Sequence, residues 1–129
     1  MGNSSGLISG NILVVEDNKE TQLLIKVMLR EFYSIDLSDN IESSIKLLDD
    51  NDYQLVLLDI NLTGSKDGIK ILQHIRSTNK IQNLPVIIIT AYDYLEEEKK
   101  YLLDNSSDFI TKPFEKESLL KSVEKNILK

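Results

Sequence analysis

The chain contains no cysteine, which excludes disulfide bridges and thiolate metal sites. The fold must therefore be held together by packing and hydrogen bonds. A cysteine-free composition is also in keeping with a reducing compartment, and we expect the protein to be cytoplasmic.

Long hydrophobic runs are missing as well. The longest, residues 55–58 and 86–89, have the length of a strand and are far shorter than the roughly 20 residues that cross a bilayer. We therefore expect no membrane segment.

Residues 1–10 contain three glycines and three serines and lack the charged, then apolar, order of a signal peptide. We interpret them as a flexible linker or a remnant outside the folded domain, which we place at residues 11–129.

Basic residues are in the minority. Lysine and arginine together number 15 against 21 acidic residues, for a formal net charge of -6. A chain of this charge lacks the broad electropositive surface that holds a phosphate backbone, so we expect no direct binding to nucleic acid. With 129 residues, of which 41% are hydrophobic, the chain can bury one core, and we expect a single domain.

What the chain does have is a regular alternation of short apolar runs and amphipathic segments. The runs predict strands at residues 12–15, 33–37, 55–58, 86–89 and 107–110. The run 55–58 is apolar at every position, which is typical of a central strand buried on both faces. Five strands alternating with five helices predict an α/β fold with a parallel sheet covered by helices on both sides.

Apolar residues at helical spacing mark the helices. Asn18 or Asp17 is placed to cap the first one, and Leu23, Leu24, Val27 and Met28 predict that it runs to about Phe32. The corresponding residues of the other helices are Ile41, Ile45 and Leu48; Ile69, Leu72 and Ile75; Leu95, Leu102 and Leu103; and Leu119, Val123 and Ile127.

Polar residues follow the strands at the points where the strands end. Glu16 and Asp17 come after the first strand, Asp59 after the third, Thr90 after the fourth and Lys112 after the fifth. Because the carboxyl ends of parallel strands meet at one edge of the sheet, we expect these side chains to converge there. Each residue alone is more often a cap or turn former, but the ordered combination favours a functional site.

Three carboxylates brought together repel one another, so they need raised pKa values or a cation, and hard oxygen ligands favour magnesium. A bound cation would also allow one carboxylate to act as a nucleophile towards a phosphoryl group, and Asp59 on the central strand is the candidate. The Thr90 hydroxyl can donate to a phosphoryl oxygen, and the Lys112 ammonium can reach the same group as a point charge.

Four motifs carry a resemblance to a known family. They are Ile12-Leu13-Val14-Val15-Glu16-Asp17-Asn18, Leu57-Leu58-Asp59-Ile60-Asn61, Thr90-Ala91 and Lys112-Pro113-Phe114. Over about residues 11–128 the sequence resembles the receiver domain of two-component response regulators. The resemblance implies a flavodoxin-like fold with strand order 2-1-3-4-5. It leaves open whether the chain is a stand-alone regulator or the receiver of a larger protein such as a hybrid histidine kinase.

The resemblance also implies roles for the acidic residues. Asp59 would take a phosphoryl group from a phosphohistidine of a histidine kinase or a histidine phosphotransfer protein. Asp17 and Asp59 would ligate magnesium, Glu16 would act mainly through bound water, and Asn61 would add its backbone carbonyl.

The response to phosphorylation is implied by the same resemblance. Thr90 and Lys112 would bind the phosphoryl oxygens, and Phe109 matches the family's switch aromatic, here without the common tyrosine hydroxyl. The Lys112-Pro113 peptide bond can be cis. An output partner or a second copy would bind to the fourth helix, last strand and last helix, where Tyr92, Tyr94, Tyr101 and residues 96–100 gather. A merely solvated helix explains that cluster equally well.

The chain departs from the family pattern in two places. The loop after Asp59 has Thr63 where a proline is usual and is one residue longer, which affects partner docking. Asn105 stands where the family often has a glycine, and asparagine tolerates positive φ best among the other residues, so the helix end should be kept.

Three other functions compete with this interpretation. A receiver that is never phosphorylated could serve as a scaffold. A haloacid-dehalogenase-like phosphatase would need a second aspartate where this chain has Asn61. A flavin or nucleotide carrier would need a glycine- or hydroxyl-rich loop after the first strand, where Glu16 and Asp17 would repel its phosphate.

Overall fold

The computed structural model describes residues 10–62, 67–91 and 96–128 of the chain. Apart from Gly10, the predicted linker at residues 1–10 lies outside the described residues. So do residues 63–66 of the atypical loop, as well as Tyr92 and Tyr94 of the predicted output face. No helix within the described ranges has both the length and the apolar character needed to cross a bilayer.

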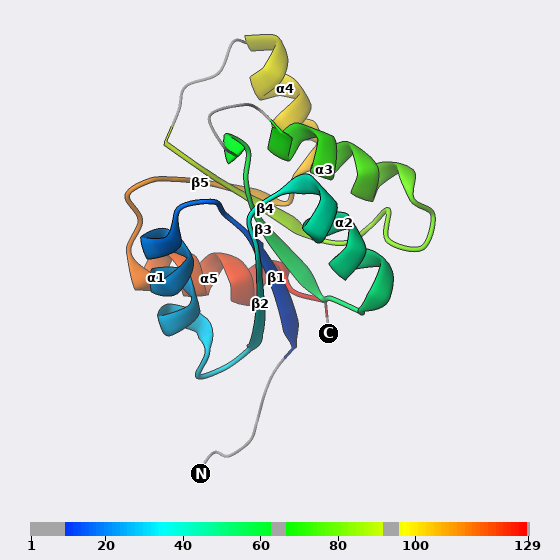
Figure 1. Ribbon diagram of the computed structural model, residues 1–129. Coiled ribbons are helices and arrows are strands. Elements are labelled where there is room, and N and C mark those ends of the chain that lie inside the picture. The colour runs from blue at the N-terminus through cyan, green and yellow to red at the C-terminus, as the bar shows by residue number, and fades with distance from the viewer. Residues whose placement is uncertain (1–9, 63–66, 92–95, 129) are drawn as a thin grey trace.

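One parallel sheet forms the centre of the domain (Figure 1). Its strands are β1 (Asn11–Val15), β2 (Ser34–Ser38), β3 (Leu55–Asp59), β4 (Val86–Thr90) and β5 (Asp108–Thr111). They lie in the order β2-β1-β3-β4-β5, and every neighbouring pair is parallel. The α/β fold and the strand order implied by the family resemblance are confirmed. The second and last strands each begin one residue later than predicted.

Helices cover both faces of the sheet. They are α1 (Lys19–Leu29), α2 (Ile41–Asp50), α3 (Asp67–Ser77), α4 (Glu96–Asn105) and α5 (Lys116–Asn126). Figure 1 shows α1 and α5 on one side of the sheet and α2, α3 and α4 on the other. The buried side chains divide in the same way, with Leu48, Leu72 and Leu102 in one cluster and Ile25 and Leu119 in the other.

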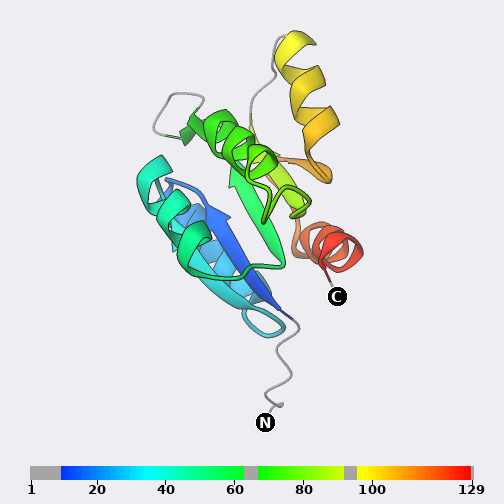
Figure 2. The same ribbon diagram turned by 90° about the vertical axis from the view of Figure 1, so that its right-hand side faces the viewer.

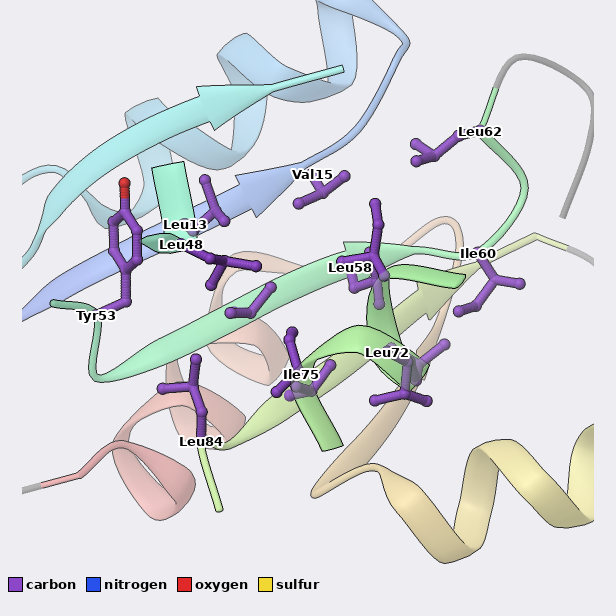
Figure 3. Packing of buried hydrophobic residues seen from close by; sticks show 14 of the residues in the cluster. Leu13, Val15, Leu48, Tyr53, Leu58, Ile60, Leu62, Leu72, Ile75 and Leu84 are labelled. Carbon is purple, nitrogen blue, oxygen red and sulfur yellow. The ribbon is translucent and has the colours of Figure 1, made fainter. Parts of the chain in front are cut away.

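The central strands contribute alternate side chains to the two clusters. In β3, Val56 and Leu58 belong to the cluster beneath the helices α2 and α3, whereas Leu55 and Leu57 belong to the cluster beneath α1 and α5. Figure 3 shows Leu58 close to Leu72 and Ile75 of α3. All five residues of β3 are buried. Burial on both faces explains why the strand is apolar without alternation, as the sequence predicted.

The prediction for the first helix was wrong in its end and in its buried face. The helix ends at Leu29, and Leu23, Leu24 and Val27 are 62%, 48% and 47% exposed. The buried residues are instead Gln22, Ile25 and Leu29. Asn18 caps this helix by accepting a hydrogen bond from the backbone N–H of Thr21 at 2.9 Å, as predicted. In α4, Leu103 is exposed and Leu102 is buried.

Gly68 allows α3 to start directly against the end of β3. A Cβ atom at this position would lie 2.4 Å from the carbonyl oxygen of Asp59 and 2.5 Å from the Cα of Ile60. The Gly68 N–H donates to the Ile60 carbonyl at 3.0 Å. Both colliding atoms belong to backbone, so no side-chain movement could relieve the contact. Glycine is required here by close approach.

We expect Gly68→Ala to lower the free energy of unfolding by about 2 to 3 kcal/mol, because the backbone must shift to admit a methyl group. Alanine favours a helix over glycine by about 1 kcal/mol, so propensity alone would act in the opposite direction. Urea denaturation measures the difference. Gln73→Ala, at an exposed position of α3, is the matched control and should stay within about 0.5 kcal/mol. A variant Gly68→Ala as stable as that control would contradict the argument.

Candidate functional site

The polar residues predicted to converge lie at the carboxyl edge of the sheet. Glu16 follows β1 directly, Asp59 ends β3, Thr90 ends β4 and Lys112 follows β5. Glu16, Asp59 and Thr90 are buried, and Lys112 is half-buried. The parallel arrangement is what brings together residues that are far apart in the chain.

Lys112 joins two of these carboxylates. Its Nζ lies 2.6 Å from Glu16 Oε1 and 3.2 Å from Asp59 Oδ2, and its side chain is 22% exposed. The Lys112 backbone N–H donates to the Thr90 carbonyl at 2.8 Å, which holds the lysine beside the end of β4. The Lys112-Pro113 peptide bond is cis, as the resemblance implied.

Backbone amides bind the remaining oxygens of the same two carboxylates. The Asn18 N–H donates to Glu16 Oε2 at 3.0 Å, and the Asn61 N–H donates to Asp59 Oδ1 at 3.0 Å. Each carboxylate therefore accepts one bond from the lysine and one from the backbone. Charge-assisted bonds of this kind fix both carboxylates in place.

Burial and charge shift the ionisation of this site. Burial raises the pKa of Glu16, the bonds from Lys112 and Asn18 oppose that rise, and the nearby charge of Asp59 adds to it. Burial alone would lower the pKa of Lys112, but the bond to Glu16 and the charge of Asp59 raise it overall. Lys112 therefore stays charged at neutral pH, and Glu16 takes up a proton more readily than an ordinary glutamate.

The acidic residues form a cluster that could hold a divalent ion. Glu16, Asp17 and Asp59 each offer one carboxylate oxygen, and these oxygens lie within 4.8 Å of one another. When all three are ionised, the single positive charge of Lys112 leaves two negative charges uncompensated. Hard, clustered oxygen donors of this kind suit Mg²⁺. The cluster could bind a metal, as the sequence predicted.

Thr90 and Phe109 lie at different distances from the carboxyl edge of the sheet. In the register of β3 and β4, Asp59 pairs with Ile89, so Thr90 is one residue further along the neighbouring strand. Phe109 pairs with Ile88 inside the sheet, is half-buried and packs on the core beneath α2, α3 and α4. The structure thus brings Thr90 to the edge and leaves Phe109 half-buried against the core cluster.

Two contributors to the site were not predicted from the sequence. The Gln22 amide donates to the Glu16 carbonyl at 2.6 Å and lies 3.4 Å from the Ser38 carbonyl, so it fixes the turn that carries Glu16. The sequence signal for this role is that Gln22 is a polar residue on the buried face of α1. This signal can be recognised only once the buried face of the helix is known. The direct contact between Lys112 and Glu16 was also not foreseen, since Glu16 was assigned to bound water.

Comparison with known proteins identifies the family. Residues 12–124 match the family model of the response regulator receiver domain. The chain belongs to this family. The receiver domain is similar to the transcriptional regulatory protein HprR of Escherichia coli, with 36% identity over 113 residues, which are 87% of this chain and 49% of that protein. An uncharacterized transcriptional regulatory protein of Bacillus subtilis, YkoG, is 35% identical and is matched over 48% of its length by 86% of this chain. The receiver domain thus spans about half the length of these curated relatives.

Solved receiver domains have the same fold. The signal receiver domain of a LuxO repressor protein from Vibrio parahaemolyticus superimposes with a TM-score of 0.80 at 27% identity, over 91% of this chain and 88% of that one. The receiver domain of a sensor histidine kinase from Pseudomonas aeruginosa also reaches 0.80, at 26% identity, over 91% of this chain and 96% of that one. That structure holds a magnesium ion coordinated in its active-site cleft.

This receiver domain is a phosphorylation switch of two-component signalling, and receiver domains are phosphorylated by histidine kinases. As a receiver domain it is not a classical enzyme. The family assignment sets aside the phosphatase and the flavin-carrier alternatives.

We expect Lys112→Met to bind Mg²⁺ more tightly than the wild type, because the ammonium that neutralises Glu16 and Asp59 is removed. A gain of about tenfold, equivalent to about 1.4 kcal/mol, is the expected size. Titration calorimetry with magnesium chloride measures it. Lys121→Met removes the same charge from an exposed position on α5 and should leave the affinity unchanged. Equal or weaker binding by Lys112→Met would show that the lysine does not compete with the metal.

Proposed function

We propose that Asp59 accepts the phosphoryl group and that Lys112 and Thr90 bind its oxygens. The observation that carries this proposal is the placement of Lys112. Its ammonium already lies 3.2 Å from an Asp59 oxygen at the buried edge of the sheet. A cation held there can attract the charge of an incoming phosphoryl group without a large rearrangement.

Asp59 is favoured over the other two acids by its position. It ends the central strand β3, so it has β1 with its acidic residues on one side and β4 with Thr90 on the other.

In the reaction, a bond forms between an Asp59 oxygen and phosphorus while the bond between phosphorus and the donor's imidazole nitrogen breaks. The electron pair stays on that nitrogen, which takes up a proton from solvent. The product is an acyl phosphate.

Four residues are proposed to hold magnesium. Asp17 and Asp59 would ligate it directly, Asn61 would use its backbone carbonyl, and Glu16 would act mainly through bound water. The convergent carboxylate oxygens of Glu16, Asp17 and Asp59 support this set, and so does the magnesium site of the related Pseudomonas receiver. Bound magnesium would offset the negative charge of the phosphoryl oxygens.

Phosphorylation would act as a switch through charge. The phosphoryl group carries about -1.5 to -2 charges at neutral pH in place of the single negative charge of the Asp59 carboxylate, which draws the Lys112 ammonium and the Thr90 hydroxyl towards it. Lys112 would then exchange part of its contact with Glu16 for the phosphoryl oxygens. Phe109, which packs on the same core cluster as Tyr101 and Leu102 of α4, would transmit the change to the surface formed by α4, β5 and α5.

The proposed partners follow from this switch. The donor is a histidine kinase or a histidine phosphotransfer protein. The surface of α4, β5 and α5 is the site for an output partner or a second copy of the domain. Because receiver domains are typically cytoplasmic, we also propose that location.

We expect the wild-type domain, incubated with magnesium and acetyl phosphate, to gain the mass of one phosphoryl group. Asp59→Asn should gain none, because the nucleophilic carboxylate is lost. Asp52→Asn, at an exposed position before β3, should react like the wild type. Intact-mass spectrometry measures all three. An unchanged wild-type mass would favour a scaffold that is never phosphorylated, and a mass gain in Asp59→Asn would place the phosphoryl group elsewhere.

A further inference from the structure

The second half of the helix α4 packs on the rest of the domain. Leu102 is buried, and Tyr101 and Asn105 are half-buried, whereas Lys99 and Lys100 are exposed. Figures 1 and 2 both show the start of α4 farther from the sheet than its end. The end of the helix is therefore one place where its position is fixed.

Arg76 of α3 binds that end. Its Nε donates to the carbonyl of Asn105 at 2.8 Å, and its Nη1 donates to the carbonyls of Leu84 at 2.7 Å and Gln82 at 3.1 Å. One half-buried guanidinium thus joins α3, the last residue of α4 and the segment that leads into β4. The planar group with several donors can bind these carbonyls together, which a lysine ammonium does less well.

The charge of Arg76 also complements α4 electrostatically. The last carbonyls of a helix lack partners within it and carry partial negative charge. The last turn of α4 contains no basic residue of its own. Arg76 therefore supplies from a neighbouring helix the positive charge that favours this terminus.

A second set of bonds ties the same end to the sheet. The Ser107 N–H donates to the Val86 carbonyl at 2.7 Å, and the Val86 N–H donates to Ser107 Oγ at 3.2 Å. Val86 begins β4, and Thr90 ends it. The segment just after α4 is thus bonded to the start of β4, and α4 itself follows the other end of β4 in the chain.

We propose that Arg76 is a positioning residue that fixes the C-terminal end of α4 as a pivot, about which the helix reorients when the state of Thr90 changes. This inference rests on the proposed function for the reorientation, but the anchoring itself does not. On the surface formed by α4, β5 and α5, the displacement of the backbone is then largest at the start of α4 and smallest at residues 105–107.

The anchor is tested by hydrogen exchange of the unphosphorylated domain, followed by NMR. In Arg76→Gln, the amide of Ser106, which donates to the Leu102 carbonyl at 2.9 Å, should exchange at least about tenfold faster than in the wild type. The amides of β3 should keep wild-type rates, which shows that the fold is intact. Lys100→Gln, which breaks the exposed pair with Asp104 at 2.9 Å, is the matched control and should leave Ser106 unchanged. Wild-type exchange at Ser106 in Arg76→Gln would overturn the inference.

The pivot is tested by adding magnesium and beryllium fluoride, a phosphoryl analogue. In the wild type, chemical-shift changes in α4 should fall from its start towards Asn105 and leave Ser106 and Ser107 nearly unmoved. In Arg76→Gln the chemical-shift changes should extend to Ser107. Wild-type changes at Ser107 as large as those at the start of α4 would overturn the pivot. If the wild type shows no change at all, the proposed function fails, and the exchange result still decides the anchor.

Arg76→Lys keeps the charge and should give an exchange rate at Ser106 between those of the wild type and Arg76→Gln. It replaces Arg76→Gln in both experiments if that variant does not fold.

Discussion

The ammonium of Lys112, shared between the carboxylates of Glu16 and Asp59, is the interaction on which the functional edge depends. Buried carboxylates repel one another, and the lysine neutralises only part of their charge. With Asp17 beside them, the site keeps an excess of negative charge that a divalent cation can offset. In the proposed function, the same lysine detects a phosphoryl group on Asp59, so one cation would connect the resting state of the switch with its response.

The sheet is what makes this interaction available. All strands run in parallel, so the loops that carry acids, hydroxyl and lysine leave the same edge. Strands β3 and β4 are buried along their full length, which makes them rigid supports for Asp59 and Thr90. Gly68 lets α3 begin immediately beside Asp59, and Gln22 fixes the turn of Glu16. Core packing and site geometry are therefore determined by the same elements.

Much of the architecture was predictable because burial on both faces leaves continuous apolar runs such as residues 55–58, and because strand ends carry the polar residues. The buried face of α1 was not predictable from spacing. Leu23, Leu24 and Val27 have the spacing of a buried helix face but are exposed. The buried face instead contains the polar residue Gln22, whose amide donates to the Glu16 carbonyl. Long-range bonds were equally hidden. Nothing in the local sequence around Arg76 indicates that it meets the end of another helix.

The most direct test of the central claim is the ¹⁵N resonance of the Lys112 ammonium. In the free domain it should be distinct from those of exposed lysines and protected from solvent exchange, because it is half-buried and bonded to two carboxylates. Addition of magnesium and beryllium fluoride should shift it in the wild type and leave it unshifted in Asp59→Asn. A Lys112 resonance that resembles those of exposed lysines and does not respond to the analogue would contradict the account.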